Sequence, residues 1–194
     1  MTKQRLLNAA ERLMLAKGFA ATSVEEICDA AKLTKGSFFH YFDSKAQLGR
    51  EVLERFCASG QQQMQAACAA AKDPLQRVYA HVEWAIAVTK RCRQSQACLL
   101  GTFAQELSDT HPMIRSVCAN AFTRWAQRLK EDLDAAKAIY APRARLDTAS
   151  LAEHFIAVLE GAKILARAKQ DPRIEERSLR HFKRYLESVF QPNR

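Results

Sequence analysis

The sequence predicts an all-α protein, and three observations support this prediction. Glycine and proline are scarce, with 6 and 5 residues among 194, so the chain has few places to turn. Between the prolines, apolar residues recur at the spacing of a helix face. No stretch shows the sustained alternation of apolar β-branched and polar residues that a half-buried strand requires.

The first helices can be placed from their caps. Thr2 is expected to cap the first helix, and Gly18 follows it where a left-handed C-terminal cap is common. Ser23 and Glu26 have the spacing of a capping box, so a second helix begins there and ends near Lys32.

A third, very short helix follows almost at once. Thr34 can cap it, it ends around Tyr41, and residues 43–45 begin a long fourth helix. Two short helices separated by about three residues have the geometry of a helix-turn-helix. A generic three-helix bundle has the same spacing, so the residues of the third helix must decide between the two.

Proline marks the breaks in the rest of the chain. Asp73-Pro74, His111-Pro112 and Asp171-Pro172 each pair a break with a proline at a helix start, and residues 141–143 read as a loop. We therefore expect a headpiece over residues 1–46 and a bundle of about six helices over residues 47–194.

Composition limits the class of protein. The 30 Lys and Arg exceed the 21 Asp and Glu, and this net charge of +9 favours a polyanionic partner, although many basic proteins have none. Six cysteines without a CxxC pair favour reduced thiols in the cytoplasm. No apolar run approaches the roughly 20 residues of a membrane span, so no membrane partner is expected.

Residues 30–45 read AAKLTKGSFFHYFDSK. This stretch resembles the signature of TetR-family regulators, roughly A-G-V-[ST]-K-G-[ST]-[LF]-Y-x-[YH]-F-x-[SN]-K. It matches at the Lys-Gly-Ser triplet, at the aromatic cluster and at Phe-x-Ser-Lys. Two positions depart from the pattern: Phe39 stands where tyrosine is common, and Lys32 where glycine is usual.

The resemblance implies that the third helix reads double-stranded DNA. Ser37 and Phe39 would face the major groove, Phe38 and Phe42 would turn into the core, and His40 would either touch DNA or be inert. Tyr41, Lys45 and either Thr22 or Ser23 would contact phosphates, and Lys35 and Gly36 would contact phosphates or base edges. The full predicted set is Thr22, Ser23, Lys35, Gly36, Ser37, Phe39, His40, Tyr41 and Lys45.

The same resemblance implies a homodimer on a palindromic operator, paired through the last two helices. Two apolar stripes fit that use, unless they only cover the monomer's own core: Leu151, Phe155, Val158, Ala162 and Leu165, and then Leu179, Phe182, Leu186 and Val189.

The middle of the chain is expected to bind a small, largely apolar effector that releases a repressor from DNA. Candidate wall residues are His81, Trp84, Val88, Cys98, Phe103, Phe122 and Trp125, although aromatic residues at helical spacing are more often core. Glu83 and Glu106 are either polar anchors or surface residues.

Cys98 lies in a segment similar to the G-C-L-[LT] stretch of a TetR subgroup, some of whose members sense oxidants or electrophiles. Lys90, Arg91 and Arg93 precede it, and cations beside a helix start lower a thiol pKa. The alternative is a small buried hydrophobe.

Two other classes of protein compete with this interpretation. A helical di-metal enzyme needs Glu-x-x-His pairs, and the sequence has none, nor a phosphate loop or a nucleophile elbow. We therefore expect no catalytic residues, no metal and no cofactor. A helical interaction module that has lost DNA binding is disfavoured because Lys35, Gly36, Tyr41 and Lys45 are retained.

Overall fold

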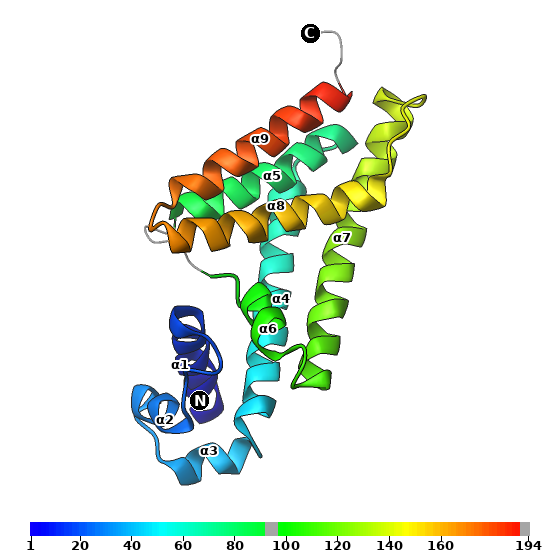
Figure 1. The fold of residues 1–194 in the computed structure, drawn as a ribbon. Coiled ribbons are helices and arrows are strands. Elements are labelled where there is room, and N and C mark those ends of the chain that lie inside the picture. Colours follow the sequence, from blue (N-terminus) through cyan, green and yellow to red (C-terminus); the bar gives the residue numbers. More distant parts are fainter. Residues whose placement is uncertain (92–96, 191–194) are drawn as a thin grey trace. The chain divides into compact units, whose positions relative to one another are not determined.

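The computed structural model describes residues 1–91 and 97–190, and all regular elements within these ranges are α-helices (Figure 1). The helices are α1 (Thr2–Lys17), α2 (Val24–Ala31), α3 (Lys35–Tyr41), α4 (Lys45–Cys68), α5 (Pro74–Arg91), α6 (Leu99–Leu107), α7 (Pro112–Tyr140), α8 (Thr148–Ala168) and α9 (Arg173–Phe190). The all-α prediction is confirmed. Thr2 is the first residue of α1 rather than its cap, since Met1 occupies that position.

The described residues form two compact units. Unit 1 contains residues 1–60 and 97–121, and unit 2 contains residues 61–91 and 122–190. Packing therefore divides the chain differently from the boundary predicted after residue 46, because α6 and the first part of α7 pack with the N-terminal helices. The fourth and seventh helices contribute to both units.

In unit 1, α1 packs against α2 and α3, which also contact one another. At 8 and 7 residues, α2 and α3 are too short to be stable alone, so their apolar faces must be buried against neighbours. The fully buried side chains of this region include Leu6, Met14, Ile27, Phe38 and Leu48.

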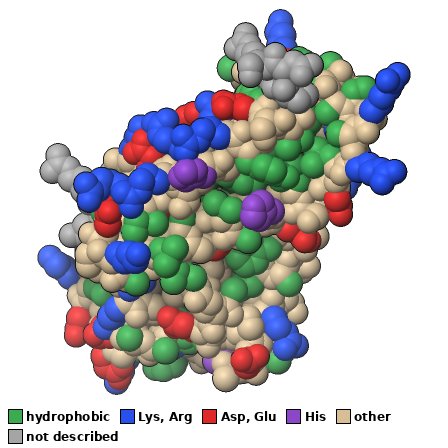
Figure 2. Space-filling model, turned by 45° about the horizontal axis from the view of Figure 1, so that its top comes forward, with side chains coloured by type: hydrophobic (Ala, Val, Ile, Leu, Met, Phe, Trp, Pro, Cys, Tyr) green, Lys and Arg blue, Asp and Glu red, His purple; other side chains and the backbone are tan. Residues whose placement is uncertain are grey.

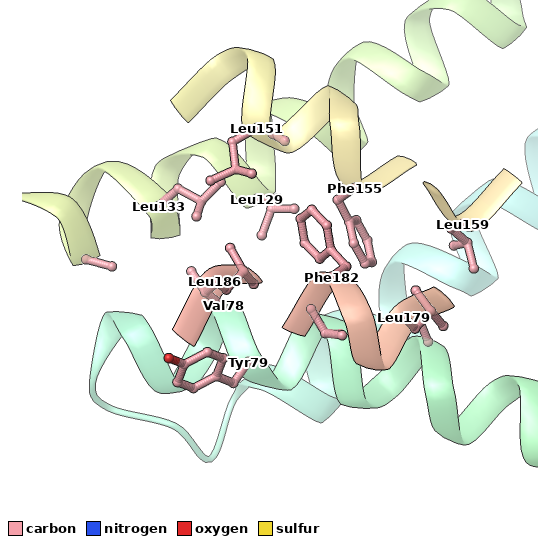
Figure 3. Packing of buried hydrophobic residues seen from close by; sticks show 14 of the residues in the cluster. Val78, Tyr79, Leu129, Leu133, Leu151, Phe155, Leu159, Leu179, Phe182 and Leu186 are labelled. Atoms are coloured by element: carbon pink, nitrogen blue, oxygen red, sulfur yellow. The ribbon is translucent and has the colours of Figure 1, made fainter. Parts of the chain in front are cut away.

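In unit 2, α5, α8, α9 and residues 122–140 of α7 enclose one apolar cluster, shown in Figure 3. Phe155 of α8 is at its centre, with its ring centroid 5.4 Å from that of Phe182 and 6.2 Å from that of Trp125. Leu179, Phe182 and Leu186 of α9 point into the same cluster, so the predicted stripe on this helix mainly covers the monomer's own core.

The buried carboxylate of Glu175 in unit 2 is paired. Glu175 of α9 is 1% exposed, and its carboxylate accepts hydrogen bonds from the Thr89 hydroxyl at 3.1 Å and the Lys163 ammonium at 3.0 Å. This arrangement follows the rule that a buried charge needs a partner, and it joins α5, α8 and α9.

Candidate nucleic-acid interface

The turn between α2 and α3 is built from backbone groups. Lys32 has φ 52° and ψ 53°, the left-handed conformation that usually favours glycine, so the lysine accepts the angle that the family glycine would take. The Leu33 N–H then donates to the Cys28 carbonyl at 2.9 Å. From α1, the Arg5 guanidinium donates to the Ala31 carbonyl at 2.5 Å, which satisfies an acceptor at the end of α2.

Hydroxyl caps fix where the two helices begin. Ser23 accepts from the Glu26 N–H at 3.1 Å while the Glu26 carboxylate accepts from the Ser23 N–H at 2.9 Å, which confirms the predicted capping box. Thr34 accepts from the Ser37 N–H at 3.1 Å and is confirmed as the cap of α3. Ser37 also shares a hydrogen bond with the Thr34 hydroxyl.

The aromatic residues of α3 and its C-cap divide into two groups. Phe38 is fully buried and Phe42 is 1% exposed, as predicted. Phe39 is 56% exposed and Tyr41 37% exposed, and His40 is also exposed with its ring against that of Tyr41. Phe39, His40 and Tyr41 thus leave an exposed aromatic face on α3, while Phe38 and Phe42 face the core.

Charge on this surface is partly neutralised within the protein. Lys35 and Gly36 are exposed at the start of α3, and the Lys35 ammonium forms an ion pair with Glu25 of α2. The Lys17 ammonium pairs in the same way with Glu26 at 2.5 Å. This hydrogen bond from Lys17, together with the Ser23 N–H, lowers the pKa of Glu26 to about 2.

Two predicted phosphate contacts have other partners. Thr22 is fully buried and its hydroxyl donates to the Gly18 carbonyl at 2.7 Å. The Lys45 ammonium donates to the carbonyls of Phe19 at 3.0 Å and Thr22 at 2.9 Å, and lies over the Phe19 ring. Both side chains therefore hold the turn between α1 and α2, and their DNA contacts stay a prediction that the burial of Thr22 and the internal hydrogen bonds of Lys45 disfavour.

Phe19 connects that turn to the rest of unit 1. Its ring centroid lies 5.5 Å from that of Phe103 on α6 and 5.7 Å from that of His111, both edge-on. Gly49 of α4 makes room for it, since a Cβ there would lie 2.8 Å from the ring. Phe103 is fully buried in this packing, and its place in the wall of an effector pocket stays a prediction.

Glu106 of α6 also holds the turn between α1 and α2, through a hydrogen bond to its backbone. Its carboxylate accepts from the Ala20 N–H at 2.9 Å. Gly18 has φ 87°, a backbone angle that favours glycine, and a Cβ built on it would also displace the Glu106 carboxylate. Glu106 is thus a partner of the headpiece rather than an effector anchor.

Comparison with known proteins identifies the family. A model described as bacterial regulatory proteins of the tetR family matches residues 6–52. A model of the tetracyclin repressor-like C-terminal domain matches residues 74–182, more than half of the chain. The chain belongs to the TetR family. It is a DNA-binding transcriptional regulator, and members of this family act by binding DNA rather than by catalysis.

Relatives of this TetR-family chain agree in sequence and fold. The transcriptional repressor DhaR of Mycobacterium sp. strain GP1 is 28% identical over 160 residues, covering 82% of this chain and 79% of that protein. The regulatory protein TetR from Rhodobacter sphaeroides has a TM-score of 0.83 at 28% identity, covering 94% and 97% of the two chains. The reduced form of Escherichia coli NemR has a TM-score of 0.78 at 25% identity, covering 95% and 96%.

The predicted effector residues of this TetR-family regulator fall in both units. His81, Trp84, Val88, Phe122 and Trp125 belong to unit 2, while Cys98 and Phe103 belong to unit 1. The structure thus brings only part of the predicted set into one unit.

His81 is 2% exposed and lies among polar and sulfur neighbours. Its Nε2 is 3.2 Å from Asp132 and its Nδ1 is 3.1 Å from the Met64 sulfur, and burial lowers its pKa. Asp132 also accepts from the Arg77 guanidinium at 2.6 Å. The imidazole is therefore held between α4 and α7.

The remaining unit 2 candidates are half-buried. Trp84, Phe122 and Trp125 pack against the apolar cluster, and Val88 is likewise half-buried. The indole N–H of Trp125 and the hydroxyl of Tyr79 are both buried, and neither has a hydrogen-bond partner among the described residues. Glu83 forms an ion pair with Lys183 at 2.7 Å, so it is a surface residue.

Cys98 is half-buried and is the N-cap residue of α6. Of the cations that the sequence places before it, Arg93 lies outside the described residues. Thiol sensing stays a hypothesis. Loss of DNA binding on mild oxidation that Cys98→Ser abolishes would support it, and an unchanged response in that variant would refute it.

The described residues contain no helix long and apolar enough to cross a bilayer. They also contain no group of three or more His, Cys, Asp or Glu side chains arranged to hold a metal ion.

Sequence reasoning missed two features of the interface. The contacts of Phe19 with Phe103 and His111 join residues more than eighty positions apart, and no periodicity of the sequence indicates them. The pairing of Glu25 with Lys35 was within reach, because opposite charges ten residues apart flank the predicted turn.

Proposed function

We propose that this TetR-family regulator is a cytoplasmic repressor that binds a palindromic operator as a homodimer and is released by a small, largely apolar effector. The exposed face of α3 carries the proposal. Phe39 is more than half exposed on a helix whose Phe38 is fully buried, and Lys35 and Gly36 are exposed at its start.

The DNA-contacting set we propose omits the two residues that build the turn. It comprises Ser23, Lys35, Gly36, Ser37, Phe39, His40 and Tyr41. Phe39 has no hydroxyl, so we expect it to contact a thymine methyl group or stack on a base edge. Lys35 and Tyr41 are expected to contact phosphates, and the cation of Lys35 should add about one unit to the steepness of the slope of log affinity against log salt, whereas the neutral Tyr41 should add little.

The experiment is a selection of bound duplexes from a randomised pool, followed by titration of the recovered duplex. Phe39→Ala and Lys35→Ala should each weaken binding, Phe39→Ala by about 1–3 kcal/mol if it reads a base. Ile139→Ala, which removes a 61% exposed apolar side chain from unit 2, serves as the control. Equal affinities for all three variants and the unmodified protein would refute the assignment.

The homodimer proposal is supported by apolar side chains that the monomer leaves exposed. Ile164 and Leu165 of α8 are 51% and 50% exposed, and Tyr185 of α9 is 47% exposed. Figure 2 shows hydrophobic side chains gathered near Lys, Arg and His over this part of unit 2. In a two-fold dimer each copy presents the same surface, so one substitution changes the interface twice.

Leu165→Glu should therefore shift the protein from dimer to monomer in sedimentation velocity. Ile139→Glu introduces the same charge at an exposed position of α7 and should leave the dimer intact. A Leu165→Glu variant that sediments as the unmodified protein would contradict pairing through this surface.

The effector proposal is supported by polar groups that unit 2 buries without partners. The Trp125 indole N–H and the Tyr79 hydroxyl are donors that a ligand acceptor could satisfy, among half-buried aromatic neighbours. We therefore expect a mostly apolar effector with a carbonyl or ether oxygen. A ligand screen by thermal shift, repeated on Trp125→Phe, tests this: hits of that class should lose binding when the N–H is removed, and unchanged hits would exclude Trp125 as the donor.

A further inference from the structure

In the free protein, the Lys35 side chain at the start of α3 already forms an ion pair. Its ammonium forms an ion pair with the carboxylate of Glu25 in the first turn of α2. The two side chains are 57% and 56% exposed, so the pair lies at the surface and is open to exchange. The left-handed turn at Lys32 brings the starts of α2 and α3 close enough for this contact.

Both partners are charged near neutral pH. The hydrogen bond from Lys35 lowers the pKa of Glu25, and the same bond raises the pKa of Lys35. In the free protein the cation that should attract a phosphate is thus neutralised by a neighbouring anion. When a DNA phosphate binds the Lys35 ammonium, the Glu25 carboxylate loses its partner and lies close to the negatively charged DNA backbone.

We propose that Glu25 limits the DNA affinity of this protein, because a DNA phosphate must displace it from Lys35. This inference rests on the proposed contact between Lys35 and DNA. Exposed ion pairs are weak, so the exchange is feasible, and the repulsion between carboxylate and phosphate is screened by salt. Glu25 therefore weakens binding without preventing it.

Of the two acidic residues in the first turn of α2, Glu25 is the one that does not take part in the capping box. Its neighbour Glu26 closes the capping box by accepting from the Ser23 N–H, and it pairs with Lys17. Replacing Glu26 by glutamine would therefore also break the Lys17 ion pair and give the capping box a weaker, uncharged acceptor.

The test compares Glu25→Gln with Glu54→Gln in the full chain. Glu54 is a matched control because it is an exposed glutamate of unit 1 that pairs with Arg50 at 3.0 Å within α4. Each variant gains one unit of net charge, so the effect of net charge alone is the same in both. Affinities are measured by fluorescence anisotropy on the duplex recovered by selection and on a 30-base-pair duplex of mixed sequence.

Glu25→Gln should bind both duplexes about three- to tenfold more tightly than Glu54→Gln at about 50 mM KCl. The difference should shrink towards unity at about 300 mM KCl, because screening weakens the interaction that Glu25 supplies. An affinity for Glu25→Gln equal to or below that of Glu54→Gln at low salt would overturn the proposal.

A double-mutant cycle separates this inference from the proposed function. Lys35→Ala should weaken binding more in the Glu25→Gln background than in the unmodified protein, since there Lys35 has no competing partner. If Lys35→Ala changes affinity in neither background, the proposed DNA contact of Lys35 fails. If it weakens binding by the same factor in both, the contact stands and the limiting role of Glu25 is wrong. Thermal unfolding of each variant confirms that folding is unchanged.

Discussion

The headpiece helices α1–α3 and the core of unit 2 are stabilised in different ways. In the headpiece, α2 and α3 are held by the Ser23 capping box, the Thr34 cap and the left-handed Lys32. In unit 2, helices of 18 to 29 residues share one apolar cluster around Phe155. The first region depends on backbone geometry that a few residues determine, and the second on buried apolar area. Substitutions should therefore separate function from stability.

The largest expected effect compares two phenylalanines. Phe155→Ala removes a 1% exposed ring from the unit 2 cluster and should lower the free energy of unfolding by about 3–5 kcal/mol. Phe39→Ala removes a 56% exposed ring from α3 and should change stability by no more than about 0.5 kcal/mol while weakening DNA binding. Urea unfolding at one fixed protein concentration measures the stability of both variants. Similar losses of stability would contradict the distinction between the two regions.

The next effect compares two glycines. Gly18→Ala must adopt φ 87° and displace the Glu106 carboxylate, so we expect a loss of about 1–3 kcal/mol in the free energy of unfolding.

Gly60 is the matched control, because it is helical and a Cβ there would meet no atom within 4 Å. Gly60→Ala should raise stability by about 0.5–1 kcal/mol, since alanine has the higher helix propensity. Urea unfolding distinguishes the two. A neutral Gly18→Ala would mean that the turn between α1 and α2 tolerates a side chain.

The smallest expected effect is the loss of folding stability at low pH that depends on Glu26. The pKa of Glu26 is about 2 in the fold against an ordinary value of 4.5, so the unfolded chain takes up a proton first as the pH falls. The stability that Glu26 contributes is present above about pH 4.5 and is lost as the pH falls towards about 2.

Glu26→Gln keeps an oxygen that can accept from the Ser23 N–H but cannot titrate in this range. The variant should lose less stability than the unmodified protein between about pH 6 and about pH 3, as measured by urea midpoints at both. Glu54→Gln is again the control, and equal acid losses in all three proteins would contradict the role given to Glu26.

The two regions also differ in how far the sequence could predict them. Capping residues act on backbone groups within four positions, so Ser23, Thr34 and the starts of α2 and α3 could be placed from local spacing. The buried positions of Phe38 and Phe42 came instead from the resemblance to the TetR signature.

Side chains that act over long sequence distances could not be placed. Lys45 matched the family motif at the right position, yet its ammonium binds carbonyls of the turn between α1 and α2, because that turn leaves acceptors within its reach. Phe103 has the spacing of a pocket residue, and only the folded chain shows that it packs on Phe19. In unit 2, apolar periodicity predicted the helices but not which aromatic residues leave a donor without a partner.

In the proposed complex, the exposed face of α3 enters the major groove of DNA, once from each copy of a dimer. Methylation interference on the duplex recovered by selection tests it most directly, because guanine N7 lies in the major groove and adenine N3 in the minor groove. We predict interference at guanine N7 in two groups whose centres are one helical turn, about 34–36 Å, or a whole multiple of it apart. Interference confined to adenine N3 would contradict binding in the major groove, and a single group of guanines would contradict binding as a dimer.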